Sequence, residues 1–234
     1  MKVYQTDQTK SKMKKYIVEF IGTFFLVSGA IFGGAVGASM ALMIMVYAGG
    51  HISGAHYNPA VSTAMYIRGK LSLSELPGYY IAQMLGGTVA ALLIFYVFER
   101  QGRFEPCDGF PSGILKTALA EIIGTFALAY VILNVATAKG TAGNSYFGLA
   151  IGGTVLAMAL TVGLFSGGVF NPAVGLGLSI QKSLCWENLW MFFVAPVIGG
   201  ILAAYVFKAV NEKEGELESI PEEQVIKIED NTPL

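Results

Sequence analysis

Long uncharged stretches alternate with short charged segments along the whole chain. Residues 20–67 contain no Asp, Glu, Lys or Arg. As one helix this run would be roughly 72 Å long, more than twice the ~30 Å core of a bilayer. It therefore predicts two membrane spans and about half a span more. Single spans are predicted for 76–98, 117–138 (interrupted only by Glu121) and 188–207, and a span with a second half-span for 141–181.

Composition agrees with a membrane protein. Hydrophobic residues make up 54% of the chain and charged residues 13%, against about 25% charged residues in soluble domains. A net charge of −1 gives no basic excess for binding nucleic acid. The sequence has no nucleophile–base pair, metal-ligand cluster or phosphate loop. We therefore expect no enzyme activity, no metal and no cofactor.

The chain contains an internal repeat. Glu-Phe-Ile-Gly-Thr-Phe at 19–24 returns as Glu-Ile-Ile-Gly-Thr-Phe at 121–126, and Ser-Gly-Ala-His-Tyr-Asn-Pro-Ala-Val at 53–61 returns as Ser-Gly-Gly-Val-Phe-Asn-Pro-Ala-Val at 166–174. Each half holds three spans, so the halves cross the membrane in opposite directions, an arrangement that builds pathways across membranes. The predicted fold is an all-α membrane protein with six transmembrane helices plus two half-helices in an inverted 3+3 repeat.

The two half-spans follow the Asn-Pro-Ala motifs, at 59–68 and 172–182. Asn as N-cap and Pro at the first helical position start a helix. Irregular backbone before such a half-helix is tolerated at membrane depth only where it lines a cavity. The sequence therefore predicts that both half-helices begin near the membrane midplane, where their N-termini meet.

The distribution of Lys and Arg predicts the topology. With the N-terminus inside, eleven of these residues are cytoplasmic and four external, as the positive-inside rule requires. Both termini are then cytoplasmic, in a plasma or inner membrane. Cys107 and Cys185 both fall outside, either as two unrelated residues or as a disulfide. The predicted domains are a basic cytoplasmic tail at 1–14, a membrane domain at 15–211 with repeats at about 15–100 and 114–211, and an acidic, disordered tail at 212–234.

Two Asn-Pro-Ala motifs in an inverted six-span repeat resemble the major intrinsic protein family, the aquaporins and aquaglyceroporins. Residues 50–61 resemble the family's first signature, 80–83 its third span and 194–200 its sixth span. The resemblance covers about residues 15–210. It implies a passive channel in a lipid bilayer for water and small uncharged solutes, with one pore in each protomer of a homotetramer.

The resemblance also implies roles for the motif residues. The amides of both Asn residues present N–H donors to the pore, and each half-helix N-terminus carries roughly half a positive charge, which disfavours protons and cations. The residues of the two motifs are Asn58, Pro59, Ala60, Asn171, Pro172 and Ala173. The backbone carbonyls expected to line the two vestibules belong to Gly54, Ala55, His56, Gly167, Gly168 and Val169.

Two carboxylates, Glu19 and Glu121, lie inside predicted spans, where charged groups are functional candidates. We expect them to support the structure by accepting hydrogen bonds from the Asn-Pro-Ala loops, with help from Gln83. The alternative is a proton-coupled transporter on the same repeat. His56 is expected at the cytoplasmic mouth, where a pH gate is a further alternative, and the spacing of His51 and His56 does not suit a metal.

The selectivity position departs from the family. Most members continue the second motif with Arg, whereas this chain has Val174, followed by Gly175 where glycerol facilitators have Asp. Counting back from the motifs gives the ring Ala38, Ala159, Gly168 and Val174. This ring predicts a wide, apolar constriction that passes water together with urea, glycerol or ammonia, and some tonoplast intrinsic proteins resemble this chain in carrying Val there.

Three alternatives remain open at this stage. Neighbouring side chains such as Met40, Phe165 or Phe170 could narrow the pore, which would make the protein a strictly water-selective aquaporin. A secondary transporter would use Glu19 and Glu121 for coupling. A membrane protein with a vestigial pore would have lost selectivity at Val174.

Overall fold

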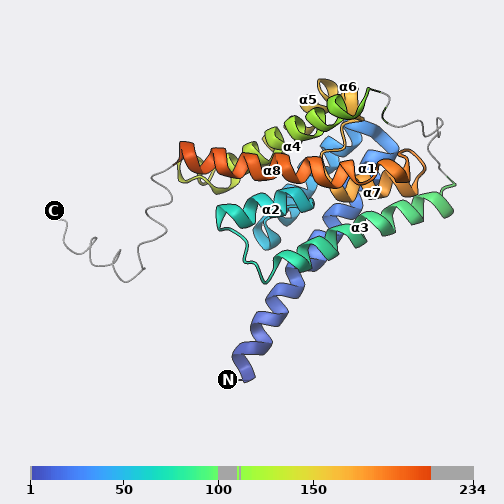
Figure 1. Cartoon of the computed structure of the whole chain (residues 1–234). Coiled ribbons are helices and arrows are strands. Elements are labelled where there is room, and N and C mark those ends of the chain that lie inside the picture. The colour runs from blue at the N-terminus through green and yellow to red at the C-terminus, as the bar shows by residue number, and fades with distance from the viewer. Residues whose placement is uncertain (1, 100–109, 111, 212–234) are drawn as a thin grey trace.

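The computed structural model describes residues 2–99, 110 and 112–211, and for residues 2–10 the backbone alone. This part of the chain forms a bundle of helices from which the N-terminal end of α1 projects (Figure 1). The helices are α1 (Lys2–Ser53), α2 (Pro59–Arg68), α3 (Leu76–Tyr96), α4 (Ile114–Thr137), α5 (Phe147–Leu160), α6 (Gly163–Ser166), α7 (Pro172–Ile180) and α8 (Met191–Val210), with 3-10 helices η1 (Lys139–Thr141) and η2 (Trp186–Asn188).

Helix α1 contains the first two spans because it folds back on itself at Gly34. This residue has φ 55° and ψ −138°, a conformation outside the helical region that glycine adopts without steric cost. The two arms approach closely just beyond the turn, where a Cβ on Gly29 would lie 2.4 Å from the carbonyl oxygen of Gly37. The turn between the first two spans therefore lies at Gly34.

The six predicted spans are all present. Four helical segments are long and apolar enough to cross a membrane, and Phe147–Leu160 is a shorter apolar helix. The long segments are Ser11–Ser53, which holds both arms of α1, and Leu76–Tyr96, Ile114–Thr137 and Trp186–Val210. The fifth span is broken after Leu160 and resumes as α6. Helix α1 begins at Lys2 rather than near Tyr16, since residues 2–15 contain neither Gly nor Pro to stop it.

The two half-helices pack crosswise between the repeats. Helix α2 of the first repeat lies against α8 of the second, and α7 of the second lies against α3 of the first. A glycine makes room at each contact. A Cβ on Gly87 would lie 2.9 Å from the carbonyl oxygen of Ala173, and a Cβ on Gly200 would lie 2.5 Å from that of Ala60. The half-helix of each repeat is therefore covered by a helix of the other repeat.

Candidate functional site: a pore between the two half-helices

The loop before each half-helix follows the same backbone path. Gly54 and Gly167 have φ 85° and 92°, and the next residues of each loop repeat the pattern. Among them, Ala55, Tyr57 and Phe170 adopt φ values of 51–52°, in the left-handed region that costs a non-glycine residue about 1 kcal/mol or more. Surrounding contacts must therefore hold these loops in place.

Glu19 is the main support of the first loop. Its Oε1 accepts hydrogen bonds from Ser53 Oγ (2.7 Å) and from the backbone N–H of His56 (2.9 Å). Its Oε2 accepts from the backbone N–H of Tyr57 (2.7 Å) and from Gln83 Nε2 (2.8 Å). The side chain is fully buried, where unpaired N–H groups of the loop would be costly.

Glu121 supports the second loop in the same way. Its Oε1 accepts from Ser166 Oγ (2.6 Å) and from the backbone N–H of Val169 (3.0 Å), and its Oε2 accepts from the backbone N–H of Phe170 (2.6 Å). Pro196 stands at the position equivalent to Gln83, so this carboxylate has no counterpart to the Gln83 bond. Both carboxylates contact the loops as predicted and do not line the cavity described below.

Asn58 and Asn171 link the two loops to one another. Each Oδ1 caps its own half-helix, accepting from the backbone N–H of Ala60 or Ala173 at 2.9 Å. Each Nδ2 donates across the interface, Asn58 to the carbonyl oxygen of Phe170 and Asn171 to that of Tyr57, both at 2.9 Å. Since an amide nitrogen carries two hydrogens, one N–H of each Asn is left for the pore.

Tyr57 and Phe170 anchor the loops by their rings. A Cβ on Gly22 would lie 2.0 Å from Cε1 of Tyr57, and a Cβ on Gly124 would lie 2.1 Å from Cε1 of Phe170. Each ring therefore occupies the space left by a missing side chain on a spanning helix. The Tyr57 hydroxyl also donates to the carbonyl oxygen of Met45 at 2.9 Å.

A cavity of about 100 Å³ lies beside the two Asn residues. Among its lining residues, all in the described part of the chain, His56, Asn58 and Asn171 have polar side chains and none is charged. The four predicted constriction residues, Ala38, Ala159, Gly168 and Val174, all line this cavity. A Cβ on Gly168 would lie 3.3 Å from the Cβ of Ala159, so these two positions face one another. That the four form the narrowest point stays a prediction.

The side chains that were considered as fillers of this cavity lie elsewhere. Met40 is 47% exposed and Phe165 is 48% exposed, and neither lines the cavity. Phe170 does line it, but its ring is held against Gly124. The space beside Val174 is therefore bordered by aliphatic side chains and backbone.

A second cavity of about 540 Å³ lies beyond Ile132, which lines both. The predicted carbonyl residues divide between the two, with Gly54 and Ala55 in the larger cavity and His56, Gly167, Gly168 and Val169 in the smaller. His56 lines the smaller cavity, next to the loop residues that line the larger one, and its Nδ1 lies 3.1 Å from Ser62 Oγ. His51 and Lys139 line the larger cavity, which we call the vestibule.

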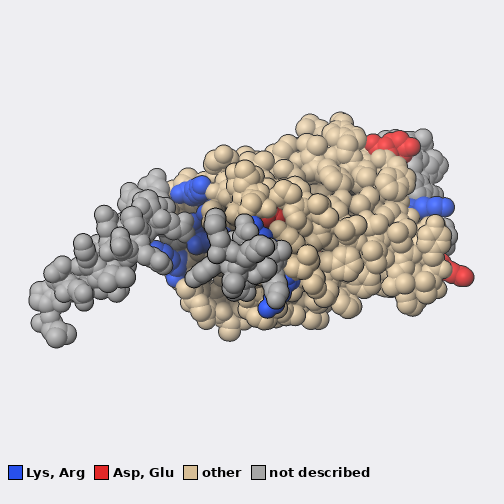
Figure 2. Space-filling view, turned by 90° about the horizontal axis from the view of Figure 1, so that it is seen from below, with Lys and Arg blue, Asp and Glu red and all other residues tan. Residues whose placement is uncertain are grey.

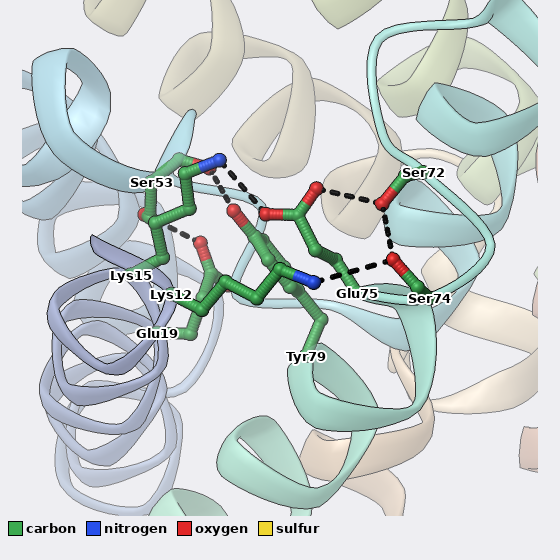
Figure 3. A network of polar contacts seen from close by, with 8 residues as sticks. All are labelled: Lys12, Lys15, Glu19, Ser53, Ser72, Ser74, Glu75 and Tyr79. Atoms are coloured by element: carbon green, nitrogen blue, oxygen red, sulfur yellow. Dashed lines mark hydrogen bonds and ion pairs between the residues drawn. The ribbon is translucent and has the colours of Figure 1, made fainter. Parts of the chain in front are cut away.

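Charged groups join α1 to the start of α3 near the first loop (Figure 3). Lys15 Nζ lies 2.9 Å from Glu75 Oε1, and Ser72 Oγ donates to Glu75 Oε2 at 2.8 Å. Burial raises the pKa of the Glu75 carboxyl, but the bonds from Lys15 and Ser72 and the charges of Lys15 and Lys12 outweigh it, so the pKa lies below its usual value. From the next turn of α3, Tyr79 donates to the carbonyl oxygen of Ser53 at 2.6 Å.

Cys185 is disulfide-bonded, and Cys107, the other cysteine of the chain, lies outside the described residues. Within the described ranges, no three His, Cys, Asp or Glu side chains form a group that could hold a metal ion.

Sequence reasoning missed three contributors to this site. The hydroxyls of Ser53 and Ser166 bond the two glutamates, and both serines stand in the repeated motif, so their recurrence was a usable signal. The aromatic residue before each Asn also recurs. Gly22 and Gly124 recur in the repeated motif as well, but recurrence does not show that they receive these rings, because that depends on packing across the bundle.

Three comparisons with known proteins bear on this arrangement. The model of the family described as "Major intrinsic protein" matches residues 6–207. "Aquaporin NIP1-1" of Zea mays is 37% identical over 215 residues, covering 85% of this chain and 75% of the relative. "Glycerol uptake facilitator protein-like 6" of Lactiplantibacillus plantarum is 32% identical over 217 residues, covering 86% and 100%. The X-ray structure of the aquaglyceroporin from Plasmodium falciparum superposes with a TM-score of 0.70 at 22% identity, covering 84% and 95%.

Proposed function

The chain belongs to the major intrinsic protein family, and on this premise we propose that it is a passive channel for water together with small neutral solutes such as urea, glycerol and ammonia. It is an integral multi-pass membrane protein, and members of this family are channels rather than enzymes. The names of its relatives include both an aquaporin and a glycerol uptake facilitator, which supports water and small solutes as cargo.

The observation that carries the solute range is the absence of an arginine beside the cavity. Val174 stands directly after the second Asn-Pro-Ala motif, and with Ala38, Ala159 and Gly168 it borders the cavity without a charge or a side-chain donor. A guanidinium at this place would add five N–H donors and a positive charge. Without it, we expect discrimination by size to be loose, with no side-chain donor at these four positions to hold a solute.

The Asn pair supports exclusion of protons. Each amide is oriented by two hydrogen bonds, one to its own half-helix and one to the opposite loop. The remaining N–H of each Asn meets a water between two helix N-termini, where positive partial charge gathers. A water that accepts from both amides has its own hydrogens turned away from its neighbours, so a proton wire is interrupted there.

The two buried glutamates speak against coupled transport. A carboxylate that takes up and releases a cation must reach the pathway, yet Glu19 and Glu121 are both fully buried and occupied by donors from the loops. We propose that the two glutamates hold the strained loops in place. Gln83 and the two loop serines have the same role.

The remaining parts of the proposal concern assembly and orientation. We propose a homotetramer with one pore in each protomer, a plasma or inner membrane as its location, and both termini on the cytoplasmic side. Most of the basic residues visible in Figure 2 lie at one end of the molecule, which supports this orientation. The division into an N-terminal segment, a membrane domain at 15–211 and an acidic tail at 212–234 belongs to the same proposal.

Stopped-flow light scattering on reconstituted liposomes tests this function. Vesicles are challenged separately with sucrose, urea and glycerol, and the wild type is compared with Val174→Arg and Val174→Leu. We expect rapid shrinkage in sucrose and re-swelling in urea or glycerol. Val174→Arg should slow the re-swelling far more than the shrinkage, whereas Val174→Leu, which adds one methylene and no charge, should slow it only slightly.

Two results would contradict the proposal in different ways. If the vesicles shrink quickly but never re-swell, the protein is a strictly water-selective aquaporin. If shrinkage is no faster than in empty liposomes, the protein is not an open channel under these conditions, and the vestigial-pore alternative gains support.

A further inference from the structure

The pore cavity and the vestibule meet at one side chain. The smaller cavity, beside Asn58 and Asn171, holds about 100 Å³, and the vestibule holds about 540 Å³. Among the described residues, Ile132 of α4 is the only one that lines both. A solute that moves from the Asn pair into the vestibule therefore passes this side chain.

Two neighbouring helices pass from one cavity to the other beside Ile132. On α1, Leu42 lines the smaller cavity and Val46, one turn later, lines the vestibule. On α5, Val155 lines the smaller cavity and Ile151, one turn earlier, lines the vestibule. Both α1 and α4 pack against α5, and one helical turn rises about 5.4 Å, so the boundary is a short stretch of the pore. We call these five residues the neck: Leu42, Val46, Ile132, Ile151 and Val155.

The neck is apolar and well packed. Its side chains are between 2% and 8% exposed, and all of them belong to the hydrophobic core of the bundle. None of them can donate or accept a hydrogen bond. They are also larger than most side chains of the predicted ring, which consists of Ala38, Ala159, Gly168 and Val174.

An apolar neck sorts neutral solutes by the hydration that they give up. A polar group that loses water without gaining another partner costs about 1–3 kcal/mol. Glycerol is wider than water or urea and carries several hydroxyls, so a narrow neck removes more of its hydrogen bonds to water. Width and polarity of the solute therefore act in the same direction at this point of the pore.

We propose that the neck, with Ile132 at its centre, is the constriction that sets the size limit of this pore, and that the predicted ring is the wider of the two. This inference rests on the proposed channel function and deepens it. It places the limit on solute size on the vestibule side of the Asn pair, whereas the ring beside Val174 lies in the smaller cavity.

Stopped-flow light scattering on liposomes that contain the full chain tests the neck. Shrinkage in sucrose reports water flux, and re-swelling in urea, glycerol and erythritol reports solute flux. Ile132→Ala widens the neck. Leu133→Ala is the matched control, because Leu133 is the next residue of α4, is fully buried and lines neither cavity. Both variants remove a buried aliphatic side chain from the same turn, so a general loosening of the bundle would affect them alike.

We expect Ile132→Ala to speed re-swelling in glycerol by about tenfold relative to Leu133→Ala, which corresponds to about 1.4 kcal/mol of barrier. The gain should be largest for erythritol, smaller for glycerol and urea, and smallest for water. Ile132→Val costs only about 0.5–1.5 kcal/mol of stability and should show the same order with a smaller gain. Ile132→Phe, which adds bulk, should slow glycerol more than water.

Val174→Ala tests the rival place for the size limit. This change widens the ring and leaves the neck as it is, so we expect it to speed glycerol less than Ile132→Ala does. A larger gain from Val174→Ala would place the limit at the ring and overturn the proposal. Equal solute permeability of Ile132→Ala and Leu133→Ala would also overturn it.

Failure of the channel function is recognised separately. If wild-type vesicles shrink no faster than empty liposomes, the wild type is not an open channel and the proposed function fails. Water flux through Ile132→Ala then decides the neck by itself. Flux that appears in this variant and not in Leu133→Ala supports the neck as the barrier, and the absence of such flux overturns it.

Discussion

Gly124→Ala tests the packing that holds the second pore loop. The added methyl carbon would lie 2.1, 2.4 and 2.5 Å from three ring atoms of Phe170. Non-bonded carbon atoms in favourable contact are about 3.5–4.0 Å apart. The ring is buried and cannot turn aside freely. Its backbone is fixed at both ends of the peptide, by Glu121 at the N–H and by Asn58 at the carbonyl.

The magnitude follows from two opposing effects. Alanine favours a helix interior over glycine by about 0.5–1 kcal/mol, while overpacking costs about 1–3 kcal/mol and sometimes more. The Phe170 ring would have to move by more than about 1 Å to restore normal contact distances, which places the overpacking cost at the upper end of its range. We therefore expect a net loss of stability of about 1–3 kcal/mol. Gly153→Ala is the matched control, because a Cβ on Gly153 of α5 meets nothing within 4 Å, and it should be neutral or stabilise by about 0.5–1 kcal/mol.

Thermal unfolding of the detergent-solubilised protein measures the difference. At roughly 2–4 °C per kcal/mol for a chain of this size, a difference of about 1–4 kcal/mol should separate the unfolding temperatures of the two variants by roughly 2–16 °C, and Gly124→Ala should also lower water flux. Gly22→Ala, which meets Tyr57 in the same way, should behave like Gly124→Ala. Adding Phe170→Leu should recover part of the loss. Equal stability of Gly124→Ala and Gly153→Ala would refute the anchoring of the loop by this ring.

Two further changes probe the Asn pair and the ion pair beside the first loop. Asn58→Asp keeps the oxygen that caps α2 but replaces the donor to the Phe170 carbonyl with a second oxygen. Unfolding in detergent should show a loss of stability of about 1–3 kcal/mol, and a pH-sensitive dye inside liposomes should show a larger proton leak. Unchanged stability would contradict the cross-loop bond. The lowered pKa of Glu75 means that its ion pair stabilises the fold above the unfolded-state pKa of about 4.3 and that this contribution fades as pH falls through the folded-state value. The stability difference between wild type and Glu75→Gln should therefore vanish in acid, and a difference that persists there would show that the carboxylate charge is not its source.

The repeat made much of this pore predictable from sequence. Asn58 and Asn171 are 113 residues apart, and the sequences around them match. This repetition predicts both half-helices and the two glutamates that support the loops before them. Counting from these motifs is reliable because helices have a fixed rise and turn. The four ring positions found by counting do border one cavity.

What the sequence could not supply depends on distances between segments remote along the chain. The bond from Asn58 to the Phe170 carbonyl joins residues 112 positions apart, and its partner choice is set by how the two loops interlock. The same holds for the rings against Gly22 and Gly124, since glycine in a membrane helix is equally consistent with helix–helix contact. The break after Leu160 of α5 is marked by no Pro, and Thr161 and Gly163 beside it are residue types that also occur inside the other spans.

The crosswise contacts of α2 with α8 and of α3 with α7 have a consequence for biosynthesis. The first pore loop receives its final neighbour only after α8 has been made, and α8 begins at Met191 while α2 ends at Arg68. At 5–20 residues per second, translation of the intervening stretch takes roughly 6–25 s. During that interval the polar groups of the nascent first half are in the bilayer without the helix that covers them. We therefore expect the yield of folded protein to depend on how well these polar groups are shielded until α8 arrives.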